Sequence, residues 1–230
     1  MRYLNTDHEI YRPSPPETSA TQRKNIVVEL GAGTGLCGIF ISKIFDNSLV
    51  YITDRKSQIS LIEDNIRLNS DYLDAEKNTF SKASSSSTLS SEVRMMTAAP
   101  SIKDSSLISG PTSLAFELDW QSQTDILSFK TQIAESRIDL ILAADVLYDH
   151  NLSRALFALI EQLQIDSKTR ILIAQKLRGD DSHQQVTSSY VENRLDQYCI
   201  TRVWEEARVV VWCLQRLPRK IECGEQFTID

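Results

Sequence analysis

The chain has few of the residues that build zinc centres and disulfide frameworks. Its 230 residues include four cysteines and three histidines. No two cysteines form a C-x-x-C pair, and no histidine stands at zinc-ligand spacing. We therefore expect no metal site and reduced thiols, with Cys37 and Cys213 packed in the core rather than taking part in catalysis.

Long hydrophobic runs and stripes of basic residues are also missing. The longest apolar run, residues 138–147, is too short to span a bilayer, and the polar residues 1–12 do not resemble a signal peptide. The formal net charge is -6 and the basic residues are scattered, which argues against direct binding of nucleic acid. We expect a monomer that binds neither nucleic acid nor membrane and that resides in the cytoplasm, or in the cytoplasm and nucleus.

Length and apolar content predict a single α/β domain. With 41% hydrophobic residues, a chain of this size can bury a proper core. Residues 1–25 carry several prolines and predict an extended lead-in, so we assign the domain to residues 26–230. Within it, a serine-rich segment at about 71–112 shows no sustained apolar period and predicts a disordered insertion.

Residues 26–38, I-V-V-E-L-G-A-G-T-G-L-C-G, predict a buried strand, a glycine loop and, from residue 38 to 45, a helix. Glycines suit such a loop because they reach positive φ and let backbone N–H groups approach a ligand. A P-loop would need G-K-[ST], which is absent. The dinucleotide fingerprint G-x-G-x-x-G fits only when it is counted from Gly33, because Leu36 breaks the count from Gly31.

An acid stands two residues before the first of these glycines. Glu29 would repel a pyrophosphate, whereas it suits the ammonium group of S-adenosylmethionine. The spacing E-x-G-x-G-x-G is therefore similar to the first motif of the seven-strand methyltransferases that use this cofactor. The alternative is a loop that only turns the chain.

The remaining apolar patterns predict a doubly wound α/β fold. Further strands are expected at 49–53, 113–120, 138–143, 170–174, 200–205 and 208–217, and further helices at 57–69, 152–163 and 186–198. With the first strand, these elements predict a seven-strand, mostly parallel, Rossmann-like sheet whose last strand is antiparallel.

Two residues at the ends of expected strands suit a nucleoside ligand. Asp54 ends the second strand, where both ribose hydroxyls can donate to one carboxylate, and the alternative is an N-cap for the following helix. Trp120 ends the third strand and can stack on adenine, and the alternative is a core or lid tryptophan.

Four separated segments together resemble family 16 of the small S-adenosylmethionine-dependent methyltransferases, which consists largely of protein lysine methyltransferases. The four segments are E-L-G-A-G-T-G at 29–35, T-D-R-K at 53–56, E-L-D-W at 117–120 and A-D-V-L-Y at 144–148. The last contains the D-x-x-Y that marks this family after the fourth strand. The resemblance covers residues 26–217 apart from the insertion, and it implies S-adenosyl-L-methionine as cofactor and a lysine of a protein as substrate.

The resemblance also implies the site residues. Asp145 would capture and aim the amine, and Tyr148 would shape a channel for the aliphatic stem; the alternatives are a helix cap for Asp145 and a core or surface position for Tyr148. The residues expected to bind the cofactor are Glu29, Gly31, Ala32, Gly33, Gly35, Asp54, Trp120 and Ala144.

One departure from the family keeps other functions open. Members usually carry a tryptophan before the first strand, whereas residues 1–25 contain none, so either Tyr3 or Tyr11 takes its place or the element is missing. The alternatives are methylation of an arginine, an N-terminus or a small amine, and a catalytically silent methyltransferase fold that binds proteins. A nicotinamide-dependent oxidoreductase is a more distant one, favoured by the glycine register that starts at Gly33.

Overall fold

The computed structural model describes residues 23–45, 47–81, 112–134, 136–163, 165–177, 191, 193, 194 and 196–217, and for residues 70–81 it describes the backbone alone. The described strands are β1 (Asn25–Leu30), β2 (Ser48–Asp54), β3 (Thr112–Glu117), β4 (Ile138–Ala144), β5 (Arg170–Lys176), β6 (Tyr198–Glu206) and β7 (Val209–Arg216). The described helices are α1 (Leu36–Ile44), α2 (Lys56–Ser81), α3 (Gln123–Ile133) and α4 (His150–Gln162).

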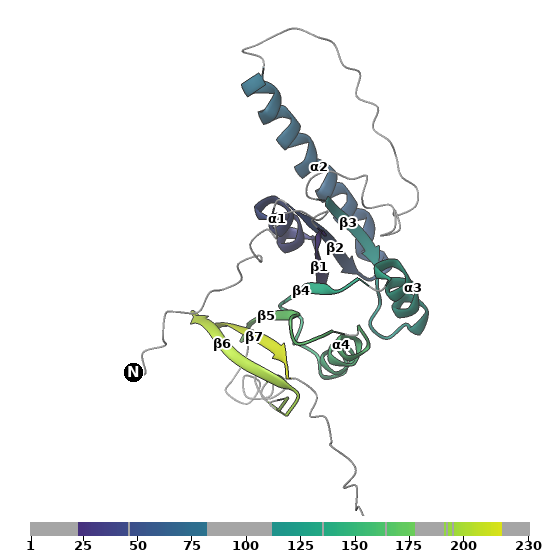
Figure 1. Ribbon diagram of the computed structural model, residues 1–230, viewed down its shortest axis with the longest axis vertical. Helices are drawn as coiled ribbons and strands as arrows, with labels where there is room; N and C mark the ends of the chain where they lie inside the picture. Colours follow the sequence, from purple (N-terminus) through teal and green to yellow (C-terminus); the bar gives the residue numbers. More distant parts are fainter. Residues whose placement is uncertain are drawn as a thin grey trace, which may run out of the picture.

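The strands form one seven-stranded sheet in the order β3-β2-β1-β4-β5-β7-β6 (Figure 1). The first five strands are parallel, and β7 runs antiparallel to both β5 and β6. The predicted fold class, including the antiparallel last strand, is confirmed. From β1 the chain adds β2 and β3 on one side of the sheet, and from β4 it adds the later strands on the other side. The strand order therefore reverses between β1 and β4, and their carboxyl ends flank the crevice where such sheets bind ligands.

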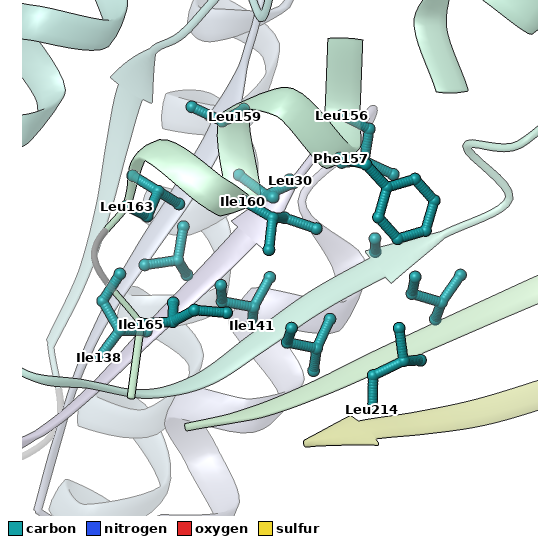
Figure 2. Packing of buried hydrophobic residues seen from close by; sticks show 14 of the residues in the cluster. Leu30, Ile138, Ile141, Leu156, Phe157, Leu159, Ile160, Leu163, Ile165 and Leu214 are labelled. Carbon is teal, nitrogen blue, oxygen red and sulfur yellow. The ribbon is translucent and has the colours of Figure 1, made fainter. Parts of the chain in front are cut away.

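Helices cover both faces of the sheet because side chains alternate along each strand. In β1, Val28 and Leu30 face the core that α3 and α4 complete, whereas Val27 faces the core that α1 and α2 complete. Figure 2 shows side chains of α4 packed over Leu30 and Ile141. The buried residues of α4 recur at helical spacing at positions 153, 156, 157, 159 and 160, and the C-cap Leu163 continues this stripe, which is why the helix lies flat on the sheet.

Helix α3 was not predicted, although its signals are in the sequence. Ser122 is its N-cap: the hydroxyl donates to Asp125 Oδ1 at 2.8 Å and accepts from the Asp125 N–H at 3.3 Å. Ile126, Phe129 and Ile133 form its buried stripe. A capping pair followed by apolar residues at i, i+3 and i+7 is a helix signature.

Several boundaries differ from those predicted. Helix α1 begins at Leu36, β3 ends at Glu117, and α2 runs to Ser81, so the first part of the expected insertion is helical. The rest of that insertion, most of the lead-in at 1–25 and most of the helix expected at 186–198 lie outside the described residues. Tyr198, expected to end that helix, is the first residue of β6.

The cysteine expectation is wrong in part. Cys37 is exposed on α1 and Cys213 is half-buried in β7, so only Cys213 contributes to packing. None of the described helices combines the length and apolar character needed to cross a bilayer.

An ion cluster explains the aspartate inside the hydrophobic strand β4. Asp139 accepts from Arg23 Nη1 at 3.1 Å, from Arg137 Nη2 at 2.7 Å and from the Ile26 N–H at 2.9 Å. Burial by itself would raise the pKa of Asp139, but these donors outweigh it and lower the pKa below its ordinary value. The cluster lies near the amino end of β4, so it joins residue 23 to the sheet at the edge opposite the crevice.

Candidate functional site

The glycine loop leaves β1 at the crevice. Gly31, Gly33 and Gly35 all have positive φ, and the Gly35 N–H donates to the Ala32 carbonyl at 2.9 Å. A Cβ added to Gly33 would meet no atom within 4 Å. The backbone at Gly33 therefore faces open space, as a loop that receives a ligand requires.

Asp54 lies beside this loop at the end of β2. Its Oδ2 accepts from the Gly33 N–H and its Oδ1 from the Arg55 N–H, both at 2.7 Å. Neither amide belongs to α2, so these bonds do not cap that helix. The carboxylate thus lies next to the open backbone of the glycine loop.

Three segments converge on Gly31. A Cβ at this position would lie 2.9 Å from Cζ2 of Trp120 and 3.0 Å from Cγ1 of Val146. Trp120 follows β3, and Val146 belongs to the D-x-x-Y segment after β4. A side chain at position 31 would displace both, so glycine allows these segments to meet at the end of β1.

Glu29 lies beneath the loop rather than in it. Its side chain points toward α1, is 2% exposed and accepts from the Gly38 N–H at 2.8 Å. Burial, with a smaller effect of the Asp54 charge, raises the pKa of Glu29 to about 7, although the Gly38 N–H and the Cys37 thiol act in the opposite direction. In this position the carboxylate supports the first turn of α1 directly beneath the glycine loop.

Gly38 is a residue that the sequence interpretation undervalued. A Cβ here would lie 2.6 Å from both Glu29 Oε2 and Ile52 Cγ1. Gly38 therefore permits the close approach of α1 to the sheet. The third glycine of dinucleotide fingerprints has the same function, because it allows close packing of helix and strand. The register counted from Gly33 describes this packing.

Asp145 begins the loop after β4 in an unusual backbone conformation. Its φ is +59°, its N–H donates to the Ala174 carbonyl at 2.7 Å, and its Oδ1 accepts from Gln175 Nε2 at 2.7 Å. The N-cap of α4 is Asp149, which accepts from two amides of the first turn at 2.8 and 2.9 Å. The alternative that Asp145 caps this helix is therefore wrong.

Tyr148 and Ala144 lie at the same edge of the sheet. Tyr148 is 65% exposed, which excludes a core position, and it belongs to a loop rather than to a helical turn. Ala144 is exposed at the end of β4, and β4 pairs with β1, so Ala144 lies near the start of the glycine loop.

Gln175 is a site residue that sequence reasoning missed. It is 3% exposed on β5, and its Oε1 accepts from the Leu147 N–H at 2.8 Å. The available signal was a polar residue at a position where the alternation of β5 calls for an apolar one.

A family model described as lysine methyltransferase matches residues 2–87 and 111–194, well over half of the chain. This match confirms the resemblance found in the sequence and overturns the alternative of a nicotinamide-dependent oxidoreductase. No curated protein matches the chain in sequence.

Solved structures show the same fold. An O-methyltransferase family protein from Burkholderia thailandensis superposes with a TM-score of 0.53 at 12% identity, over 84% of this chain and 51% of that one. A fibrillarin/Nop5p complex gives 0.52 at 15% identity, over 84% of this chain and 73% of that one. The chain thus spans about half the length of the Burkholderia protein, and at these identities the likeness shows the fold alone.

Proposed function

Because the chain belongs to the lysine methyltransferase family, we propose that it transfers a methyl group from S-adenosyl-L-methionine to the side-chain amine of a lysine in a protein. The family depends on this cofactor. The observation that carries the proposal is the convergence on Gly31, where Trp120 and the Val146 side chain of the D-x-x-Y segment meet the glycine loop. This convergence supports the proposal because Trp120, expected at the cofactor, and Val146, in the segment that carries the expected substrate residues, both lie against Gly31.

The residues at the crevice fit the cofactor. Asp54 offers a carboxylate to the two hydroxyls of a ribose, and Gly33 offers open backbone next to it. Trp120 is half-buried at the same edge and presents an aromatic ring that suits a flat heterocycle. When bound, the cofactor supplies a methyl group that is already electrophilic, so the protein has mainly to orient the acceptor and exclude water.

Asp145 is suited to hold the acceptor amine. A lysine has an ordinary pKa of about 10.4, and keeping it neutral at pH 7 costs roughly 4.6 kcal/mol. A nearby carboxylate raises the pKa of an amine, so Asp145 binds and aims the ammonium form, which then loses its proton to water. Tyr148, three residues further along the same loop and exposed, is suited to form a wall for the aliphatic stem.

The test pairs two aspartates of the same loop. Asp145→Asn keeps the shape of the side chain but loses the charge, so we expect turnover to fall at least about tenfold while cofactor affinity stays within a few-fold. Asp149→Asn is the matched control, because asparagine caps a helix as well as aspartate does. Near-normal turnover of Asp145→Asn would remove Asp145 from the catalytic machinery.

The substrate is found by incubating a cell lysate with the protein and labelled cofactor, followed by mass spectrometry of the labelled band. We expect the label on a lysine of a protein. A label on an arginine, an N-terminus or a small amine would contradict the lysine assignment. If calorimetry detects no binding at millimolar cofactor, the result would contradict the proposed activity and favour the alternative of a catalytically silent methyltransferase fold that binds proteins.

A further inference from the structure

Gln175 occupies a core position at the carboxyl end of β5. Ile171 and Ile173 precede it on the same face of the strand and are completely buried, and Gln175 itself is 3% exposed. Burying a side-chain amide costs stability unless its groups are hydrogen-bonded. A glutamine at this position therefore requires a structural or functional reason.

The amide of Gln175 binds both ends of a short turn after β4. Its Oε1 accepts from the Leu147 N–H at 2.8 Å. Its Nε2 donates to Asp145 Oδ1 at 2.7 Å and to the Lys176 carbonyl at 3.2 Å. Chemistry dictates this orientation, because Leu147 offers a hydrogen and the carboxylate accepts one, so the reversed amide would lose both bonds.

The turn that Gln175 binds needs support. Asp145 has a φ of +59°, a conformation that a residue with a side chain adopts at a cost in free energy. The bond from the Asp145 N–H to the Ala174 carbonyl fixes the backbone, and the bond from Gln175 fixes the carboxylate. Together they hold one orientation of the Asp145 side chain.

We infer that Gln175 is a positioning residue that aims the Asp145 carboxylate at the methyl acceptor through its buried amide. A neutral donor suits this task, because a lysine or arginine at position 175 would pair with the carboxylate and compete with the acceptor amine, and a glutamate would repel it. The inference rests on the proposed function, in which Asp145 binds that amine.

The experiment compares Gln175→Leu with Thr169→Val in the full chain. Thr169 is buried just before β5 and donates to the Ile138 carbonyl at 2.7 Å, at the other end of the strand. Each substitution replaces a buried, hydrogen-bonded side chain with an apolar side chain of similar shape. A general loss of stability would therefore affect both variants. We expect Gln175→Leu alone to lower kcat at least about tenfold, with cofactor affinity within about twofold of wild type.

Two further measurements separate positioning from packing. Amide hydrogen exchange at Leu147 is expected to accelerate in Gln175→Leu and not in Thr169→Val, because its acceptor is lost. When Gln175→Leu is added to Asp145→Asn, we expect less than about a threefold further loss of turnover, because the carboxylate that Gln175 aims is already absent. Purely structural damage would lower turnover by the same factor in both backgrounds.

The inference is overturned if Gln175→Leu turns over like Thr169→Val, or if its loss is fully additive with that of Asp145→Asn. Turnover is read from the labelled methyl group that the cofactor transfers to lysate protein. A wild-type protein that transfers no methyl group refutes the proposed function instead. The hydrogen-exchange comparison needs no substrate, and unchanged exchange at Leu147 by itself refutes the hydrogen bond from Leu147 to the Gln175 amide.

Discussion

Replacing Glu29 with glutamine is expected to stabilise the protein at alkaline pH. The Glu29 carboxyl is 2% exposed and has a pKa raised to about 7, mainly by burial. Glutamine has the same shape, and its Oε1 can still accept from the Gly38 N–H that the carboxylate now accepts from at 2.8 Å. The substitution therefore removes the burial of a charge and keeps the hydrogen bond that supports α1.

The size of the effect follows from the difference between the folded and unfolded pKa. The ordinary value is 4.5 and the folded value is about 7, which corresponds to about 3 kcal/mol. Below pH 4.5 the carboxyl is protonated in both states, so wild type has no penalty there. As the pH rises, the unfolded chain ionises first, and wild type loses stability until the folded carboxyl also ionises near pH 7. Glutamine does not titrate and does not lose this stability.

The assay is urea denaturation of wild type and Glu29→Gln at pH 5 and pH 8. The difference in unfolding free energy between the two proteins is expected to shift in favour of the variant by about 2 to 3 kcal/mol from pH 5 to pH 8. At pH 8 this corresponds to a Tm higher by roughly 5 to 10 °C. Asp139→Asn is the control, because the pKa of Asp139 is lowered and its contribution is lost only as the pH falls below about 4.

The outcome that refutes this reasoning is a difference between wild type and Glu29→Gln that stays constant from pH 5 to pH 8. That result would mean that the Glu29 carboxyl is not buried at a cost. Calorimetry on the same variant tests the expected role of Glu29 at the cofactor ammonium. Unchanged affinity would limit Glu29 to the support of α1, whereas a loss of binding would support its assignment to the cofactor site.

Three other substitutions test the site and its supports. Asp54→Ala should weaken cofactor binding by about 1 to 3 kcal/mol in calorimetry, because a charged acceptor is lost, and unaltered affinity would remove Asp54 from the site. Gly38→Ala should lower the unfolding free energy by about 1 to 2 kcal/mol, because an added Cβ would lie 2.6 Å from Ile52. This overpacking outweighs the gain in helix propensity. An unchanged urea midpoint would contradict the close packing. Asp149→Ala should cost about 1 kcal/mol as a lost cap and leave cofactor affinity unchanged, and a thermal scan showing no loss would contradict the cap.

The strands, the glycine loop and the succession of elements along the chain were predictable from the sequence because their signals are local. A run such as residues 26–30 followed by glycines at alternate positions specifies a strand and a turn within a dozen residues. The acid at the end of a strand, as at Asp54, is equally local. Helix α3 was also predictable, because its capping pair and its buried stripe are local signals in the sequence.

The sheet order decided which distant segments meet. Trp120 and Val146 both reach Gly31 because β1 lies between β2 and β4 and β3 pairs with β2, although long stretches of chain separate these residues. The buried amide of Gln175 reaches Asp145 because β5 pairs with β4. Such contacts depend on strand pairing, which the local pattern of each strand does not specify.

The tertiary structure also decided between roles that one residue type can fill. Asp145 and Asp149 both precede α4, and only the hydrogen bonds show that Asp149 caps it. Glu29 stands next to the glycines in sequence, and the alternation of β1 turns it to the face of Val27, where it accepts from the Gly38 N–H of α1. The sequence alone determined the family, the fold class and the strand ends at which site residues were expected, because motifs and the succession of strands and helices are local patterns. Which side chains face that edge was decided by packing, because a side chain's direction depends on the elements that cover its strand.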